Sequence, residues 1–130
     1  MSNAEEEEDD EQTPVLRPLV WMGNSRRNIQ AFPKHAQKII GDELQLMQFG
    51  GMPRDAKLFK GAGSGVIEIA LRYAGDAYRT VVAVHLGEKI YVLHAFQKKS
   101  KKGIATPKQD VDLIKLHYAA AKEIAKHEKE

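Results

Sequence analysis

Basic side chains recur on neighbouring segments of the sequence, and their types suit phosphate chemistry. Arg72 and Arg79 stand on either side of one predicted hairpin, so both guanidinium groups can face outward from the same surface. Such a pair can clamp one phosphate and stabilise the negative charge of a pentacoordinate transition state. The alternative is a pair of solvated surface arginines that do no chemistry.

A dense lysine cluster follows shortly after these arginines, at Lys98, Lys99, Lys101 and Lys102. Mutual repulsion in such a cluster can lower the pKa of one member toward the range of a general base. The positive edge also attracts the phosphates of a nucleic acid. A run of solvated charges is the alternative interpretation.

His94 and Phe96 precede the lysines and alternate onto one face of a strand. His94 can be a general acid or base, or a hydrogen-bonded histidine near the core. Phe96 can stack on an RNA base if it is exposed, or can belong to the core. We expect no metal site and no cofactor. The other histidines do not lie at the spacing from acidic residues that metal ligands usually have; they are His35, His85, His117 and His127.

Three strands in quick succession must hold these side chains. We predict them at about residues 66–73, 78–86 and 90–97, joined by connections short enough for hairpins, which gives an antiparallel meander. In the first of them, Ile67 and Ile69 alternate with Glu68 and Arg72. One face of the sheet should therefore be core and the other polar, and we expect function on the polar face.

Helices are predicted on both sides of these strands in the sequence. A first strand at about residues 15–22, placed at a sheet edge by Pro18, precedes a short helix capped at residue 24 or 25 and a second helix over about residues 33–49. A terminal helix follows Thr106 as N-cap, with Pro107 at its first position and Gln109 completing a capping box. The order β-α-α-β-β-β-α defines an α+β fold.

The glycine-rich stretch at residues 50–65 is predicted to be a loop. Its end, Gly61-Ala62-Gly63-Ser64-Gly65, has some likeness to a phosphate-binding loop. Such a loop needs a lysine and a hydroxyl residue after its last glycine, whereas a strand continues here. We therefore interpret the glycines as an entry to the sheet.

The chain has 130 residues, enough for one globular domain, which we place at residues 15–130. Residues 1–14 are predicted to be a disordered acidic tail, and the Ser-Asn-Ala near its start is typical of a cloning remnant. Seven of the 18 acidic residues lie in this tail, so the rest of the chain is distinctly basic. The absence of cysteine excludes disulfides and a cysteine nucleophile. Because no apolar stretch could span a bilayer, we expect a soluble cytoplasmic protein that does not contact membranes.

Several of these segments together resemble a known family. The resemblance is carried by Glu68-Ile69-Ala70-Leu71-Arg72, by Tyr78-Arg79, by the run from Tyr91 to Ser100, by Thr106-Pro107, and by Trp21-Met22-Gly23-Asn24-Ser25 and Phe32-Pro33. These segments resemble the phage-derived HigB-like branch of the RelE/ParE toxin superfamily over residues 18–128. The resemblance implies a RelE-like fold, with two helices ahead of a small antiparallel sheet and a C-terminal helix.

The resemblance also implies an activity. The protein would be the toxin of a type II toxin–antitoxin pair, an endoribonuclease that cleaves translated messenger RNA at the ribosome without a metal, by attack of the ribose 2′-oxygen on the adjacent phosphorus. Arg72 and Arg79 would hold the phosphate, Lys98 or Lys99 would transfer protons with His94 as the rival, and Phe96 would stack on a base beside Lys101 and Lys102. Its partners would be the ribosome, messenger RNA and an antitoxin of the helix-turn-helix type.

The sequence departs from the family pattern at Ala70, where the family commonly has an arginine. Cleavage would be weak or absent if that arginine is needed, although the following one, Arg72, is retained. Two other functions are open: a ParE-like toxin that inhibits DNA gyrase by binding, and a basic nucleic-acid-binding module without catalysis.

Overall fold

The computed structural model describes residues 16–98 and 105–128. Along these residues the elements are β1 (Leu19–Trp21), α2 (Ser25–Gln30), α3 (Lys34–Gln48), β2 (Ala56–Leu58), β3 (Val66–Tyr73), β4 (Asp76–Ala83), β5 (Ile90–Lys98) and α4 (Lys108–Glu128). The strands form one sheet in the order β1-β5-β4-β3-β2. This arrangement confirms the predicted α+β fold, with two helices before the main strands and one after them.

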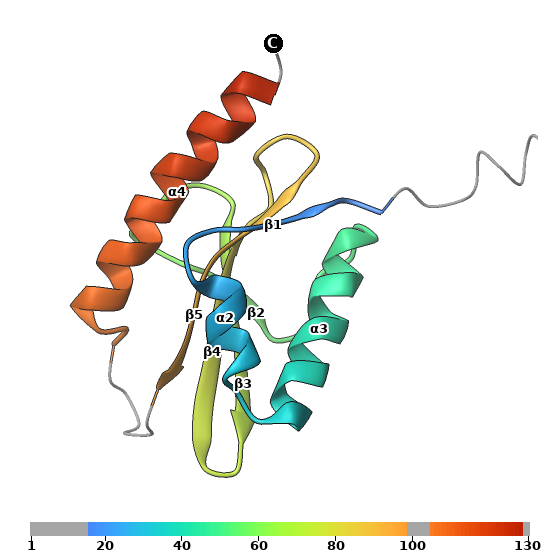
Figure 1. Cartoon of the computed structure of the whole chain (residues 1–130), viewed down its shortest axis with the longest axis vertical. Coiled ribbons are helices and arrows are strands. Elements are labelled where there is room, and N and C mark those ends of the chain that lie inside the picture. Colours follow the sequence, from blue (N-terminus) through green and yellow to red (C-terminus); the bar gives the residue numbers. More distant parts are fainter. Residues whose placement is uncertain (1–15, 99–104, 129–130) are drawn as a thin grey trace, which may run out of the picture.

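Helices cover both faces of the sheet (Figure 1). On one face, α2 and α3 enclose an apolar cluster that includes Ile40, Leu44 and Val92. On the other face, α4 contributes Ile114 and Tyr118 to a second cluster. The prediction of an open polar face is therefore wrong for much of this second face, because the apolar stripe of α4 is buried against it.

Two pairings in the sheet differ from the predicted meander. The expected loop at residues 50–65 contains β2, which pairs with β3 in antiparallel register. A three-residue strand is too short to show the alternation that would reveal it in the sequence. In addition, β1 pairs with β5 in parallel register, which is possible because a long stretch of chain separates the two strands.

The helix starts also differ slightly from the predicted caps. Asn24 stands at the N-cap of α2, but its side chain makes no capping hydrogen bond. Pro33 is the N-cap of α3, and its carbonyl accepts the Gln37 amide at 2.9 Å. At α4, the carbonyl that accepts the first helical amides, from Asp110 and Val111, belongs to Pro107. The predicted N-cap role of Thr106 is therefore wrong by one residue.

The glycine-rich loop before β3 packs closely against α4. A Cβ atom on Gly63 would lie 2.2 Å from the ring of Tyr118, and the backbone φ of Gly63 is +152°. The Tyr118 hydroxyl donates a hydrogen bond to the Ser64 carbonyl at 3.0 Å. Here glycine permits a close approach of loop and helix.

A β-bulge in β5 decides which way its second half faces. Val81 of β4 pairs with His94, whereas Val82 pairs with Val92, so Leu93 is the extra residue of β5. Such an insertion shifts the alternation of every later side chain by one position. Beyond the bulge, the side chain of Phe96 therefore lies on the α4 side of the sheet, and that of Ala95 on the other side.

Candidate functional site

The candidate site lies on the α4 side of β3, β4 and β5, toward the β3–β4 hairpin. The strand register sets its side chains in three rows: Glu68, Val81 and His94; Ala70, Arg79 and Phe96; Arg72, Ala77 and Lys98. Directly opposed residues in such rows have Cβ atoms about 5 Å apart. The structure thus brings five predicted site residues onto one face, while Lys99, Lys101 and Lys102 lie outside the described residues.

Arg79 and Glu68 form an ion pair within this face. Nη1 of Arg79 donates to Oε2 of Glu68, and the two side chains are only 26% and 13% exposed. The Nε atom of Arg79 is buried and has no hydrogen-bond partner among the described residues. Arg79 is thus held in place by Glu68 while part of its donor capacity stays unused.

Lys98 lies close enough to this pair to be influenced by it. Burial lowers the pKa of Lys98 below its usual range, and the nearby Arg79 guanidinium lowers it further, while Glu68 acts in the opposite direction. A lysine with a lowered pKa carries a larger neutral fraction near pH 7, which makes it a better proton acceptor. The shift of the Lys98 pKa has the direction that a general base requires, and its causes are burial and Arg79.

Arg72 completes the cationic part of the site. It lies in the row next to Arg79, and its side chain is exposed to solvent. Ala70 lies between Glu68 and Arg72 along β3 and directly opposite Arg79, so a small methyl group lies at the position where the resemblance led us to expect an arginine. The site therefore has one exposed and one half-buried arginine.

His94 and Phe96 are buried beneath the start of α4. His94 is 5% exposed, and its Nε2 atom lies 2.7 Å from Oδ1 of Asp110. Its ring stacks on that of Phe96, with centroids 5.3 Å apart and planes inclined by 20°. Phe96 is 9% exposed, so the prediction of an exposed stacking surface is wrong, and His94 matches the alternative of a hydrogen-bonded histidine near the core.

Two residues of this region were not among the predicted site residues. Glu68 shares the face of Arg72 by simple alternation, so an opposite charge one hairpin away from Arg79 was a usable signal. Asp110 gave no such signal, because its contact with His94 depends on how α4 crosses the sheet.

Neither a metal cluster nor a membrane-spanning helix is found in the described parts of the chain. Among residues 16–98 and 105–128, no three potential metal-binding side chains gather in one place. No helix within those ranges is both long and apolar enough to cross a membrane.

The fold and the site define a small α+β protein with a cluster of basic side chains on one sheet face. The model of a protein family described as phage-derived, Gp49-like proteins (DUF891) matches residues 27–119. The chain belongs to this family, and the matched region includes every described residue of the candidate site. No curated protein and no solved structure matches the chain.

Proposed function

We propose that this protein is the toxin of a type II toxin–antitoxin system, acting in the cytoplasm as a metal-independent endoribonuclease on translated messenger RNA. Membership in the phage-derived Gp49-like family is compatible with a toxin. The observation that carries the proposal is the grouping of Arg72, Arg79, Glu68 and Lys98 on one sheet face. The proposed partners are messenger RNA, the ribosome and a helix-turn-helix antitoxin.

The two arginines would bind the phosphate at the cleaved bond. Exposed Arg72 can reach an incoming phosphate from solvent, whereas Arg79 already has a fixed orientation through Glu68. A preorientated guanidinium stabilises the charge that develops on the phosphoryl oxygens without further rearrangement. Glu68 is thus proposed as a positioning residue for Arg79.

Lys98 is the proposed general base. Its neutral amine would accept the proton of the ribose 2′-hydroxyl as the 2′-oxygen attacks phosphorus, and the bond to the 5′-oxygen would break. The products are a 2′,3′-cyclic phosphate and a 5′-hydroxyl group. The leaving 5′-oxygen must take up a proton, and Lys99 is the preferred donor because Nε2 of His94 is buried against Asp110.

Primer extension on a translated messenger RNA, with and without ribosomes, tests this function. We expect wild-type protein to produce cuts in phase with codons. Arg79→Ala should reduce the cleavage rate by about 100-fold or more, as does the loss of one transition-state donor elsewhere. Arg79→Lys should restore little, because it keeps the charge but loses the bidentate geometry.

Lys126→Ala is the matched control, since Lys126 is an exposed basic residue in the last turn of α4. It should leave the cuts unchanged. Inhibition of DNA supercoiling without any RNA cleavage would instead identify a ParE-like toxin. Salt-sensitive RNA binding without cleavage would indicate a nucleic-acid-binding module.

A further inference from the structure

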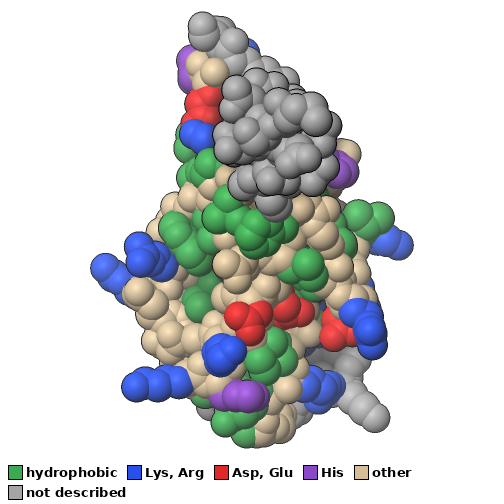
Figure 2. Space-filling model, turned by 90° about the vertical axis from the view of Figure 1, so that its right-hand side faces the viewer, with side chains coloured by type: hydrophobic (Ala, Val, Ile, Leu, Met, Phe, Trp, Pro, Cys, Tyr) green, Lys and Arg blue, Asp and Glu red, His purple; other side chains and the backbone are tan. Residues whose placement is uncertain are grey.

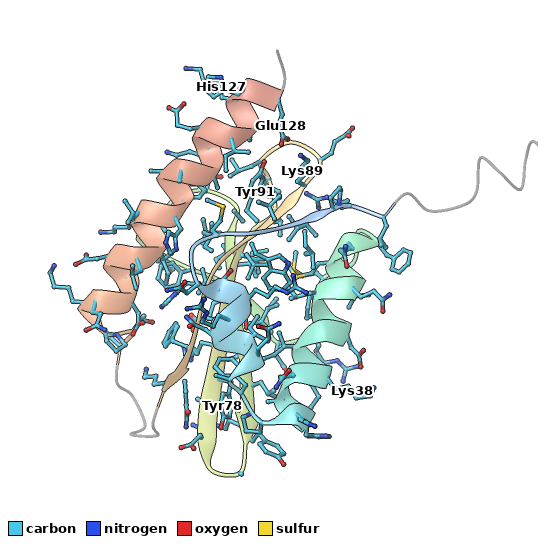
Figure 3. All side chains as sticks on the ribbon, viewed as in Figure 1. Lys38, Tyr78, Lys89, Tyr91, His127 and Glu128 are labelled. Carbon is cyan, nitrogen blue, oxygen red and sulfur yellow. The ribbon has the colours of Figure 1, made fainter. Side chains whose placement is uncertain are left out.

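The N-terminal end of α3 lies beside the β3–β4 hairpin (Figure 1). Two pairs of ring-bearing side chains, Phe32 with Tyr78 and His35 with Tyr73, join these segments. Phe32 and Tyr78 form the buried base of this aromatic cluster, with ring centroids 4.8 Å apart. The label of Tyr78 in Figure 3 shows where this aromatic cluster lies on β4. Nearer the surface, His35 and Tyr73 form a second pair, with ring centroids 5.2 Å apart and ring planes inclined by 38°.

The pair His35–Tyr73 is accessible to solvent, unlike Phe96 in the candidate site. The His35 side chain is exposed and Tyr73 is half-buried, whereas Phe96 is 9% exposed. On the face shown in Figure 2, hydrophobic atoms and Lys or Arg side chains lie side by side at the lower end of the molecule. Among the described rings beside the β3–β4 hairpin, those of His35 and Tyr73 are therefore the ones that solvent can reach.

The pair and the proposed phosphate-binding groups lie at the same end of the sheet, on its two opposite faces. Tyr73 directly follows Arg72 on β3, and the exposed Lys34 directly precedes His35. Ala74 and Gly75, both with positive φ (52° and 85°), form the tight turn that ends the sheet here. A polymer can therefore pass around the hairpin from Arg72 on one face to Tyr73 on the other.

We propose that His35 and Tyr73 bind an unpaired nucleobase of the substrate RNA, on the other side of the hairpin from the phosphate held by Arg72 and Arg79. This inference rests on the proposed function. Single-stranded RNA alternates phosphates with bases, and the order Lys34, His35, Tyr73, Arg72 offers aromatic rings flanked by cations. The base-stacking surface expected at Phe96 is thus assigned to the opposite side of the hairpin.

The test uses full-length protein and a short single-stranded RNA that carries the fluorescent base 2-aminopurine within a few nucleotides of the target phosphate. The 2′-hydroxyl at the cleavage position is replaced by hydrogen, so binding is measured without cleavage. Stacking should quench the fluorescence of the base. An RNA of the same length without a base at that position should bind wild-type protein about tenfold more weakly, because base–aromatic stacking typically has an effect of this size.

Tyr73→Phe retains the ring and should preserve both the quenching and the preference for the RNA with the base. Tyr73→Leu, which fills similar space without a π face, should lose both, and His35→Gln should weaken both without removing a buried group. The inference is overturned if wild-type protein binds the two RNAs equally, or if Tyr73→Leu and His35→Gln both quench as wild type does.

Cleavage of an unmodified messenger RNA on ribosomes is measured in parallel and separates this inference from the proposed function. Cleavage that depends on Arg79, combined with quenching that does not depend on Tyr73, would overturn the base site and leave the ribonuclease. Quenching that depends on Tyr73, without cleavage by any form of the protein, would leave the base site and overturn the ribonuclease.

Discussion

Lys98 depends on its surroundings for the lowered pKa on which its proposed role as general base rests. Burial is the first cause of its lowered pKa, the Arg79 guanidinium is the second, and Glu68 opposes both. Because the folded-state pKa lies below that of the unfolded chain, the unfolded state binds more protons between the two values. The contribution of Lys98 to the free energy of unfolding should therefore rise with pH through this window.

Arg79→Ala should raise the pKa of Lys98, and Glu68→Gln should lower it further. NMR titration of the ¹³C-dimethylated lysines measures both shifts. In wild-type protein, the signal of Lys98 should titrate at a lower pH than that of a lysine in a short unfolded peptide, because its pKa is lowered. A Lys98 titration that does not change in either variant would contradict the influence of the ion pair.

At this scale, side-chain alternation predicts part of the site. It correctly places Arg72, His94 and Phe96 as candidates for one sheet face. It does not predict that His94 and Phe96 are buried, because the bulge at Leu93 and the crossing of α4 have no short-range signature in the sequence. A buried histidine and an accessible one have the same sequence pattern.

At the scale of elements, the contact between His94 and Asp110 joins the start of α4 to β5. Asp110→Ala should lower the free energy of unfolding by about 1–3 kcal/mol, because it leaves the buried imidazole without its partner. Denaturant unfolding measures this change. Asp112→Ala is the matched control on the same helix, since the exposed pair of Asp112 with Lys108 should contribute only about 0.5 kcal/mol.

Equal losses in the two aspartate variants would contradict a specific role of the buried contact. Cleavage by Asp110→Ala provides a second readout. Since His94 supports the sheet face without a proposed proton-transfer role, the variant should retain cleavage at temperatures where it is folded.

Two glycines should respond to the same substitution in opposite directions. Gly63→Ala should lower the free energy of unfolding by about 1–3 kcal/mol, because the added methyl group would overlap the Tyr118 ring at a strained φ. Gly41→Ala should raise it by about 0.5–1 kcal/mol, because Gly41 lies inside α3 with open space around its Cα. Thermal unfolding monitored by circular dichroism measures both changes, and stabilisation by Gly63→Ala would contradict the described packing.

Long, regular elements are the ones that sequence reasoning predicts well here. The 3.6-residue period identifies α3 and α4, and alternation identifies β3 to β5 to within a few residues. Helix ends are displaced because a few local hydrogen bonds, such as those that the Pro107 carbonyl accepts, decide where a helix begins. The strand β2 is missed because its three residues are too few to show alternation.

At the scale of the whole molecule, the sheet is covered on both sides, and this explains why the accessible chemistry is confined to its hairpin end. Apolar side chains of α3 and of α4 fill the two faces. The fold class follows from the order of elements in the sequence. The parallel pairing of β1 with β5 does not follow from that order, because it joins two strands that are far apart in the sequence.

That return has a consequence for synthesis of the protein. Leu19 pairs with Ile90, and the side-chain amide of Asn28 donates to the carbonyl of Ala95 at 2.9 Å. A nascent chain cannot complete these contacts, or bring Lys98 beside Arg79, until β5 has left the exit tunnel. A protein proposed to attack translation would thus acquire its reactive face only after β5 has been synthesised, and products truncated before β5 would be harmless to the ribosome that made them.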